Sequence, residues 1–523
     1  MIKLKYPIGI QTFSTIREGG YVYVDKTGYL HALLDSGSRY VFLSRPRRFG
    51  KSLFLSMTEE FFKGNRKIFS GLDIDRHDYD WQSHPIFHLD LTTKSYKTPS
   101  SLTERLNSHL ENWETIYGNE KADRSPEERF GWLIAKAFER TGRKAVILID
   151  EYDKPLLDSV DDKQLQDSYR DTLRAFYGNL KSMDAFIRFA MLTGVTKFGH
   201  LSIFSDLNNL EDISMSEDYS GICGITPSEL HDCFDGGVKE IALKLDIPSD
   251  EAYDLLRLNY DGYHFCPENS VDVYNPFSIM NALKDRRISN YWFQTGTPEF
   301  LVKLIRSRQL ALSKLDRIEV DEDSVKSVQF DYRSSLYPVL YQTGYLTIKG
   351  YRSDVNRLIL GFPNREVEQG FYTQLMRIYI PASENDSEFS IINFYDDVMG
   401  GNAERFMIRL QSILSDFNQD GFNRIDIEQH YQDVVFIIMK LMGFYTEIEY
   451  KTASGRIDLV VKTPQYIYVF EFKIDKSARE ALNQINSKDY LLPFKADGRK
   501  LIKIGANFSN KIHSLSDWMI DEC

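Results

Sequence analysis

The most informative stretch of this chain is Tyr40-Val-Phe-Leu-Ser44, followed by Arg45-Pro-Arg-Arg-Phe-Gly50-Lys51-Ser52. An apolar strand pattern runs into a short turn. A helical pattern from Leu53 to about Phe62 follows, with apolar residues three to four positions apart. In a phosphate-binding loop, backbone N–H groups and the N-terminus of such a helix hold phosphate oxygens. The segment therefore predicts a site for a nucleoside triphosphate.

Within this loop, we expect Lys51 to contact the β- and γ-phosphates and the Ser52 hydroxyl to ligate Mg²⁺. The motif normally has glycine five positions before Gly50, and Arg45 stands there instead. A basic surface turn is the alternative interpretation. The residues expected to contact the nucleotide here are Arg45, Pro46, Arg47, Arg48, Phe49, Gly50, Lys51, Ser52 and Leu53.

An acidic pair follows a second strand pattern, Lys144–Ile149. In phosphate-loop NTPases, a carboxylate that holds Mg²⁺ ends a strand beside the loop, which predicts this role for Asp150. Glu151 would then act as the general base toward the attacking water. The alternative is that the aspartate caps a helix. The two motifs together predict ATP and Mg²⁺ as cofactors.

Four buried strand patterns alternate with helical stretches in the first half of the chain, which predicts a parallel sheet in an α/β fold. They are Ser38–Arg45, Pro85–Leu91, Lys144–Ile149 and Ile187–Leu192. The fourth pattern ends in Thr193, whose hydroxyl is predicted to sense the γ-phosphate. An ordinary turn residue is the alternative.

The 523 residues exceed one ordinary core, so we expect several domains. We predict a phosphate-loop ATPase core over 1–225 and a helical lid over 226–330. A winged-helix-like connector follows over 331–400, because the helix Leu336–Gln342 precedes two strand patterns. Residues 401–523 are predicted to form an α/β nuclease-like domain.

The N-terminal motifs resemble a known family. They are Tyr21–Thr27, Arg45–Ser52, Leu148–Asp153 and Phe204–Asn209. This part of the chain is similar to the bacterial AAA-ATPase-like family, which is common in gut Bacteroidota and usually carries a PD-(D/E)XK domain. Arg45 belongs to the usual motif of that family. The resemblance implies that Tyr21–Thr27 packs near the nucleotide and that Tyr260–Tyr263 lies in the lid.

Two carboxylates and a lysine mark a second candidate site near the C-terminus. Asp458 lies in one strand pattern, and Glu471 and Lys473 share a face of the next, because residues two apart in a strand point the same way. A hairpin would bring Asp458 near Glu471. Carboxylates that hold Mg²⁺ can support phosphodiester hydrolysis, with Lys473 neutralising charge in the transition state. The arrangement resembles the PD-(D/E)XK superfamily.

Two flanking features bear on this nuclease hypothesis. Ser477–Glu480 is a capping box that opens a helix. Glu428 falls on the apolar face of the helix predicted over Ile427–Met442, which makes it a candidate third metal ligand. A helix-start glutamate is the alternative for Glu428. A structural ion-pair ladder is the alternative for the strand cluster.

Composition limits the class of protein. The net charge of −12 disfavours a protein that simply coats nucleic acid, although residues 451–523 hold 12 Lys and Arg against 9 Asp and Glu. Four scattered cysteines form no C-x-x-C pair, so any metal should be a hard ion held by carboxylates. No apolar run approaches a membrane span.

We therefore expect a cytoplasmic ATPase that acts on DNA and has no membrane partner. Assembly into a homo-oligomer is compatible with this class of ATPase. A nucleotide-dependent switch or scaffold, whose nuclease-like domain only binds, is the alternative. A small-molecule kinase would leave the C-terminal cluster unexplained.

Overall fold

The computed structural model describes residues 4–198, 209–268, 271–295, 312, 315, 317–328, 335–379, 391–415, 427–509, 511 and 514–522. The chain divides into two compact units. The first comprises 1–310 and 315–367, and the second comprises 311–314 and 368–523. The four-domain subdivision stays a prediction.

A five-stranded parallel sheet forms the core of the first unit, in the order β2-β3-β4-β1-β5. Its strands are β1 (Tyr40–Ser44), β2 (Ile86–Asp90), β3 (Ala145–Asp150), β4 (Ile187–Gly194) and β5 (Glu211–Asp212). Every residue of β3 is buried, as expected of a strand that is covered on both faces. The predicted parallel sheet is confirmed, and four strands fall where the buried patterns placed them.

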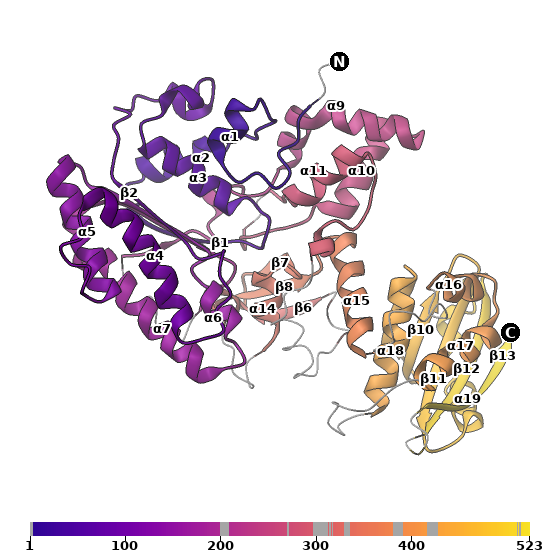
Figure 1. The fold of residues 1–523 in the computed structure, drawn as a ribbon. Coiled ribbons are helices and arrows are strands. Elements are labelled where there is room, and N and C mark those ends of the chain that lie inside the picture. The colour runs from indigo at the N-terminus through magenta and orange to yellow at the C-terminus, as the bar shows by residue number, and fades with distance from the viewer. Residues whose placement is uncertain are drawn as a thin grey trace. The chain divides into compact units, whose positions relative to one another are not determined.

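Helices cover both faces of this sheet (Figure 1). One group gathers around α3 and consists of α1 (Phe13–Glu18), α2 (Thr27–Asp35) and α3 (Lys51–Phe62). The other side holds α4 (Ser100–Tyr117), α5 (Pro126–Thr141) and α7 (Lys163–Tyr177). Two shorter helices, α6 (Lys154–Asp158) and α8 (Asn179–Ser182), complete this part. The phosphate-loop segment thus lies between a central strand and a packed helix.

Three helices follow the sheet, and their residues share one apolar cluster built around Phe234, Leu256 and Ile279. They are α9 (Pro227–Leu245), α10 (Ser249–Tyr260) and α11 (Pro276–Asp285). A capping box between Thr226 and Glu229 opens α9. These three helices lie within the range 226–330, whose assignment as a helical lid stays a prediction. Residues 269–270, 296–311, 313–314, 316 and 329–330 of that range lie outside the described part of the chain.

A small antiparallel sheet of order β6-β8-β7 follows. It contains β6 (Ile318–Asp321), β7 (Thr347–Arg352) and β8 (Arg357–Gly361), with the short helices α13 (Glu322–Lys326) and α14 (Tyr337–Gln342). The helix and two of the strands appear where the winged-helix-like pattern predicted them. The next helix, α15 (Arg365–Tyr379), spans the division between the units.

The second unit has a mixed five-stranded sheet in the order β13-β12-β11-β10-β9. Its strands are β9 (Tyr445–Thr452), β10 (Gly455–Lys462), β11 (Tyr466–Ile474), β12 (Lys500–Ser509) and β13 (Ser514–Glu522). Only the β11–β12 pair is parallel, because α19 (Ala478–Ser487) crosses over between these two strands. The unit also contains α16 (Ile391–Met399), α17 (Ala403–Ser415) and α18 (Ile427–Leu441). The predicted α/β class of this region is confirmed.

Candidate functional site

The turn between β1 and α3 has the tight backbone that a phosphate loop requires. Gly50 precedes the first residue of α3 with φ +100°, a region that favours glycine. Arg48 has φ +69° and Glu151 has φ +54°, which is uncommon for residues with a Cβ atom. Backbone strain of this kind concentrates at functional sites. The turn therefore wraps a pocket and does not run extended.

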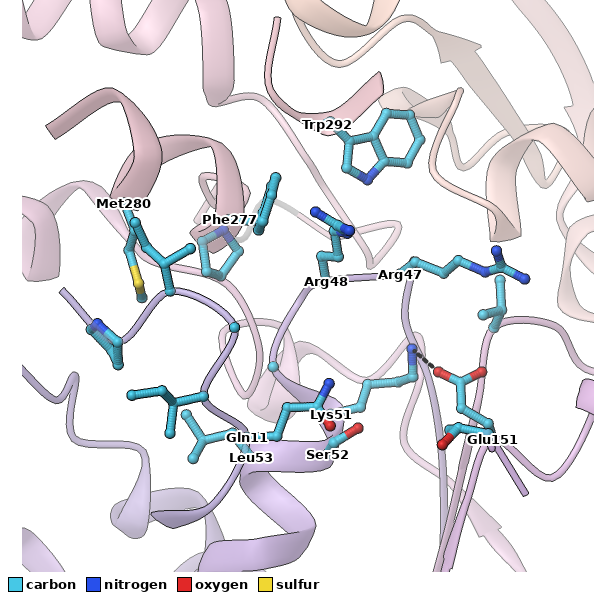
Figure 2. Close-up of a pocket in the computed structure, with 18 of the residues that line it drawn as sticks. Gln11, Arg47, Arg48, Lys51, Ser52, Leu53, Glu151, Phe277, Met280 and Trp292 are labelled. Atoms are coloured by element: carbon cyan, nitrogen blue, oxygen red, sulfur yellow. Dashed lines mark ion pairs between the residues drawn. The ribbon is translucent and has the colours of Figure 1, made fainter. Parts of the chain in front are cut away.

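Lys51 and Glu151 meet at this pocket. The Lys51 ammonium lies 3.1 Å from Glu151 Oε1 and also donates to the carbonyl oxygens of Arg45, at 3.0 Å, and Pro46, at 3.3 Å (Figure 2). Only 3% of the lysine side chain is exposed. The two motifs, about a hundred residues apart in sequence, are thus in direct contact.

The sequence did not predict the strand order: the acidic pair ends β3, which does not pair with β1. β4 lies between β1 and β3, because the crossover connections insert it there. The motifs still meet, since the carboxyl ends of parallel strands share one edge of the sheet. Thr193 of β4 donates to Asp150 Oδ1 at 2.7 Å, and the Ser52 hydroxyl bonds the same carboxyl group.

Burial raises the pKa of Asp150, and the neighbouring Glu151 charge raises it further. The bonds from Ser52 and Thr193 and the Lys51 charge act in the opposite direction. Asp150, a buried carboxyl group with a raised pKa, therefore lies next to a second acidic side chain in a site that is short of positive charge. A hard divalent cation would supply that charge, so the donor set fits Mg²⁺.

A cavity of about 510 Å³ opens beside Lys51. The predicted residues that line it are Arg47, Arg48, Gly50, Lys51, Ser52, Leu53 and Glu151. The Arg48 guanidinium lies 3.8 Å from the ring centroid of Phe277, and Figure 2 shows Arg47 extending above Glu151. The cavity therefore has cationic side chains at its loop side.

Three predicted nucleotide contacts in the loop do not line this cavity. Arg45 is buried behind the loop, where its guanidinium donates to backbone carbonyls. Phe49 is buried edge-on against Tyr263, and Pro46 faces a second cavity. These side chains hold the turn in shape.

Sequence reasoning missed the other walls of the cavity. Pro7–Gln11 forms one wall, Pro276, Phe277 and Met280 of the α11 region form another, and Trp292 stands across from them (Figure 2). The segment Tyr21–Thr27 does not line it, although Tyr23, Val24 and Lys26 line a small adjoining cavity together with Gly50. No local motif marks these residues, because only tertiary packing brings them to the loop. Residues 204–208 of the family motif lie outside the described part of the chain.

The C-terminal carboxylates lie side by side on paired strands. Leu459 of β10 is opposite Phe470 of β11, a register that brings Asp458 alongside Glu471. Asp458 Oδ2 accepts the Phe472 N–H at 2.8 Å. Lys473 Nζ donates to Glu471 Oε1 at 2.8 Å, and Glu471 is 1% exposed. The hairpin predicted from the sequence therefore brings all three side chains together, and two neighbouring carboxylates are a donor set that suits Mg²⁺.

The predicted third ligand is not established. Glu428 lies in α18, but its side chain is outside the described residues. Within the described residues, no group of three His, Cys, Asp or Glu side chains converges as a metal site. The Ser477 hydroxyl caps α19 as predicted. In the parts that the structure describes, no helix has the length and hydropathy needed to span a bilayer.

Two family models match this chain in the regions of the two sites. The model described as predicted AAA-ATPase matches residues 7–204, and that of the PD-(D/E)XK nuclease superfamily matches residues 426–518. A protein of Azotobacter chroococcum mcd 1, described as an uncharacterized protein in the vnfD 5′ region, is 34% identical over 532 positions. The match covers 100% of this chain and 99% of that protein. The chain therefore belongs to the predicted AAA-ATPase family and carries a C-terminal domain of the PD-(D/E)XK nuclease superfamily.

Proposed function

We propose that this protein binds and hydrolyses ATP at the cavity beside Lys51, and that its C-terminal site cleaves DNA. The observation that carries the first part is that Lys51, Ser52 and Glu151 line one cavity, with Asp150 bonded to the Ser52 hydroxyl beside it. A phosphate chain needs the turn and the lysine, and hydrolysis needs a carboxylate near the attacking water.

The residues at this site have separate roles in the proposed reaction. Lys51 would exchange its bond to Glu151 for a bond to a phosphate oxygen. Ser52 and Asp150 would hold Mg²⁺, which neutralises the developing charge on the phosphates. Glu151, once released from Lys51, would accept a proton from water. The apolar side chains of Phe277, Met280 and Leu53 suit the nucleobase.

The C-terminal proposal rests on the adjacent carboxylates of Asp458 and Glu471. These residues would hold Mg²⁺, which activates water for phosphodiester hydrolysis. Lys473 already lies within hydrogen-bond distance of Glu471 and would place a positive charge beside the scissile phosphate. The local excess of basic residues in 451–523 supports a nucleic-acid substrate.

A four-way comparison tests both parts. Wild type, Lys51→Ala, Asp458→Ala and the double variant would be assayed for ATP turnover and for Mg²⁺-dependent nicking of plasmid DNA. We expect Lys51→Ala to abolish ATP turnover. We expect Asp458→Ala to abolish nicking and to spare ATP turnover.

Each outcome separates one hypothesis from another. ATP turnover that persists in Lys51→Ala contradicts the ATP site. If wild type nicks neither DNA nor RNA with Mg²⁺ or Mn²⁺, with or without ATP, the switch or scaffold function replaces the nuclease function. Asp497→Ala, which removes an exposed carboxylate paired with Arg499 in the same unit, serves as the control for nonspecific loss of nicking.

A further inference from the structure

A second cavity, of about 240 Å³, lies on the other side of the phosphate loop. The loop divides between the two cavities: residues 44–46 line the second, whereas residues 47, 48 and 50–53 line the first. The remaining walls come from segments far apart in sequence, namely Lys197, Asp212, Ser214, Met215, Phe265, Val325, Lys326, Tyr341 and Gln342. All of these residues belong to the first compact unit.

Arg45 is the unusual residue among those that line this cavity. It is a buried cation that pairs with no acidic side chain among the described residues. The side chain is 1% exposed and forms no ion pair with any residue that the structure describes. Its terminal nitrogens donate to three carbonyl oxygens, those of Ser44 at 2.9 Å, Ser214 at 2.6 Å and Tyr219 at 3.1 Å. Its Nε atom is buried and has no hydrogen-bond partner among the residues that the structure describes.

Burial of the Arg45 guanidinium without a counter-charge lowers the stability of the protein when no anion is bound. Carbonyl dipoles solvate a guanidinium only partly, and a buried charge normally requires a counter-charge. The pKa of Arg45 is lowered, mainly by this burial. The ring of Phe265, whose centroid is 4.1 Å from the guanidinium carbon, covers one face of the group and leaves its edge for further bonds.

The two lysines that line the cavity have acidic partners. Lys197 pairs with Asp212 at 2.6 Å, and Lys326 pairs with Glu322 at 2.8 Å and with Asp323 at 3.0 Å. Arg45 is therefore the cation of this cavity that no acidic side chain among the described residues pairs. Ser44, Ser214 and Tyr341 add hydroxyl groups to the lining residues.

We propose that this second cavity binds a small oxyanion, inorganic phosphate or the phosphate group of a monoester, with Arg45 as its central contact. The site is distinct from the ATP cavity and does not depend on hydrolysis. An anion there would touch the residue whose carbonyl oxygen accepts the Lys51 ammonium at 3.0 Å, so occupancy would stiffen the base of the phosphate loop.

The test uses the full-length chain with Lys51→Ala, a background in which phosphate binding at the first cavity is weakened. Inorganic phosphate and glycerol 3-phosphate would each be titrated by calorimetry, with chloride at equal ionic strength as the reference. The melting temperature would be recorded in parallel, since a ligand of the native state raises it. We expect saturable binding and a higher melting temperature. Tighter binding of glycerol 3-phosphate would assign the site to a monoester.

Substitutions at the wall of the second cavity test whether the anion binds there. Adding Arg45→Lys should weaken binding about tenfold, because one charged hydrogen bond is lost. If that variant fails to fold, Lys197→Met on the cavity wall should produce a similar loss. The matched control is Lys239→Met, which removes an exposed lysine paired with Asp235 at 2.7 Å on α9. No anion-dependent effect, or equal weakening by Lys197→Met and Lys239→Met, would overturn the proposal.

Discussion

At the scale of single residues, Glu151 is the carboxylate partner of the Lys51 ammonium. Its carboxylate pairs with the Lys51 ammonium, whose side chain is almost fully buried. The same two side chains are assigned to different steps in the proposed ATPase, one to phosphate binding and the other to water activation. Nucleotide binding must therefore break the ion pair before either residue can act.

This competition predicts an uncommon combination of effects for Glu151→Gln. ATP should bind more tightly, because Lys51 no longer has a carboxylate partner. Turnover should fall by about a hundredfold or more, because the general base is lost. Binding is measured by calorimetry with ATP and Mg²⁺, and turnover by phosphate release. Glu139→Gln, at an exposed glutamate paired with Lys136, should change neither quantity. Weaker ATP binding in Glu151→Gln would contradict this role of the ion pair.

A second residue-scale feature is the buried carboxylate of Glu366 on α15. It accepts the Trp292 N–H at 2.8 Å and the Ser278 hydroxyl at 2.6 Å, so it connects a wall of the ATP cavity to α11. Burial raises the pKa of Glu366 from 4.5 to about 7, against the effect of these bonds. The folded protein therefore binds this proton more tightly than the unfolded chain does.

The sign of the resulting pH dependence follows from linkage. The stability contributed by a raised pKa is full below pH 4.5 and is lost as pH rises toward 7. Between pH 5 and pH 8, wild type should lose about 2 kcal/mol of unfolding free energy relative to Glu366→Gln, which cannot ionise. Denaturant unfolding, followed by tryptophan fluorescence at both pH values, measures the difference. If the difference in unfolding free energy between wild type and Glu366→Gln is constant with pH, the Glu366 proton is excluded as its source.

At the scale of elements, helix α19 packs closely on strand β12 beside the C-terminal site. A Cβ atom on Gly505 would lie 2.6 Å from both the Ala478 oxygen and the Leu482 nitrogen, which are backbone atoms. Gly505 is also the register partner of Glu471 on the neighbouring strand. The position of the helix and that of the carboxylate are thus coupled through one glycine.

Gly505→Ala should therefore push α19 away from the sheet and destabilise the second unit by about 1–3 kcal/mol. DNA nicking should fall, and ATP turnover should stay at the wild-type level. Gly236→Ala in α9 is the matched control, because its added Cβ meets nothing within 4 Å. That variant should be neutral or slightly more stable. Calorimetry and both activity assays measure the outcome, and unchanged nicking in Gly505→Ala would argue against the coupling.

At the scale of the whole molecule, the two candidate sites belong to different compact units. A ligand that binds only the native form of one unit stabilises that unit. ADP with Mg²⁺ should therefore raise the melting transition of the first unit and leave that of the second unchanged. Differential scanning calorimetry of the full chain tests this, with Lys51→Ala as the control that should not respond. A shift of both transitions by the same amount would show that the units unfold together.

Much of this architecture was predictable from local patterns. Buried strands, the glycine-lysine-serine turn and the carboxylate hairpin each depend on residues close together in sequence, and each appeared where it was predicted. The strand order was not predictable, and the sequence did not reveal that β4 lies between β3 and β1. Arg45 illustrates the same limit: its motif position suggested a phosphate contact, but its side chain lies behind the loop.

The amino-acid sequence by itself determined the two classes of site, because the chemistry of Lys51, Asp150, Asp458 and Glu471 is fixed by residue type and short spacing. The tertiary structure alone decided what surrounds them. Long-range packing brought Pro7–Gln11 and α11 to one cavity and left the Arg45 charge buried beside another. Such contacts depend on how helices and strands pack, and residues far apart in sequence carry no local pattern that reveals them.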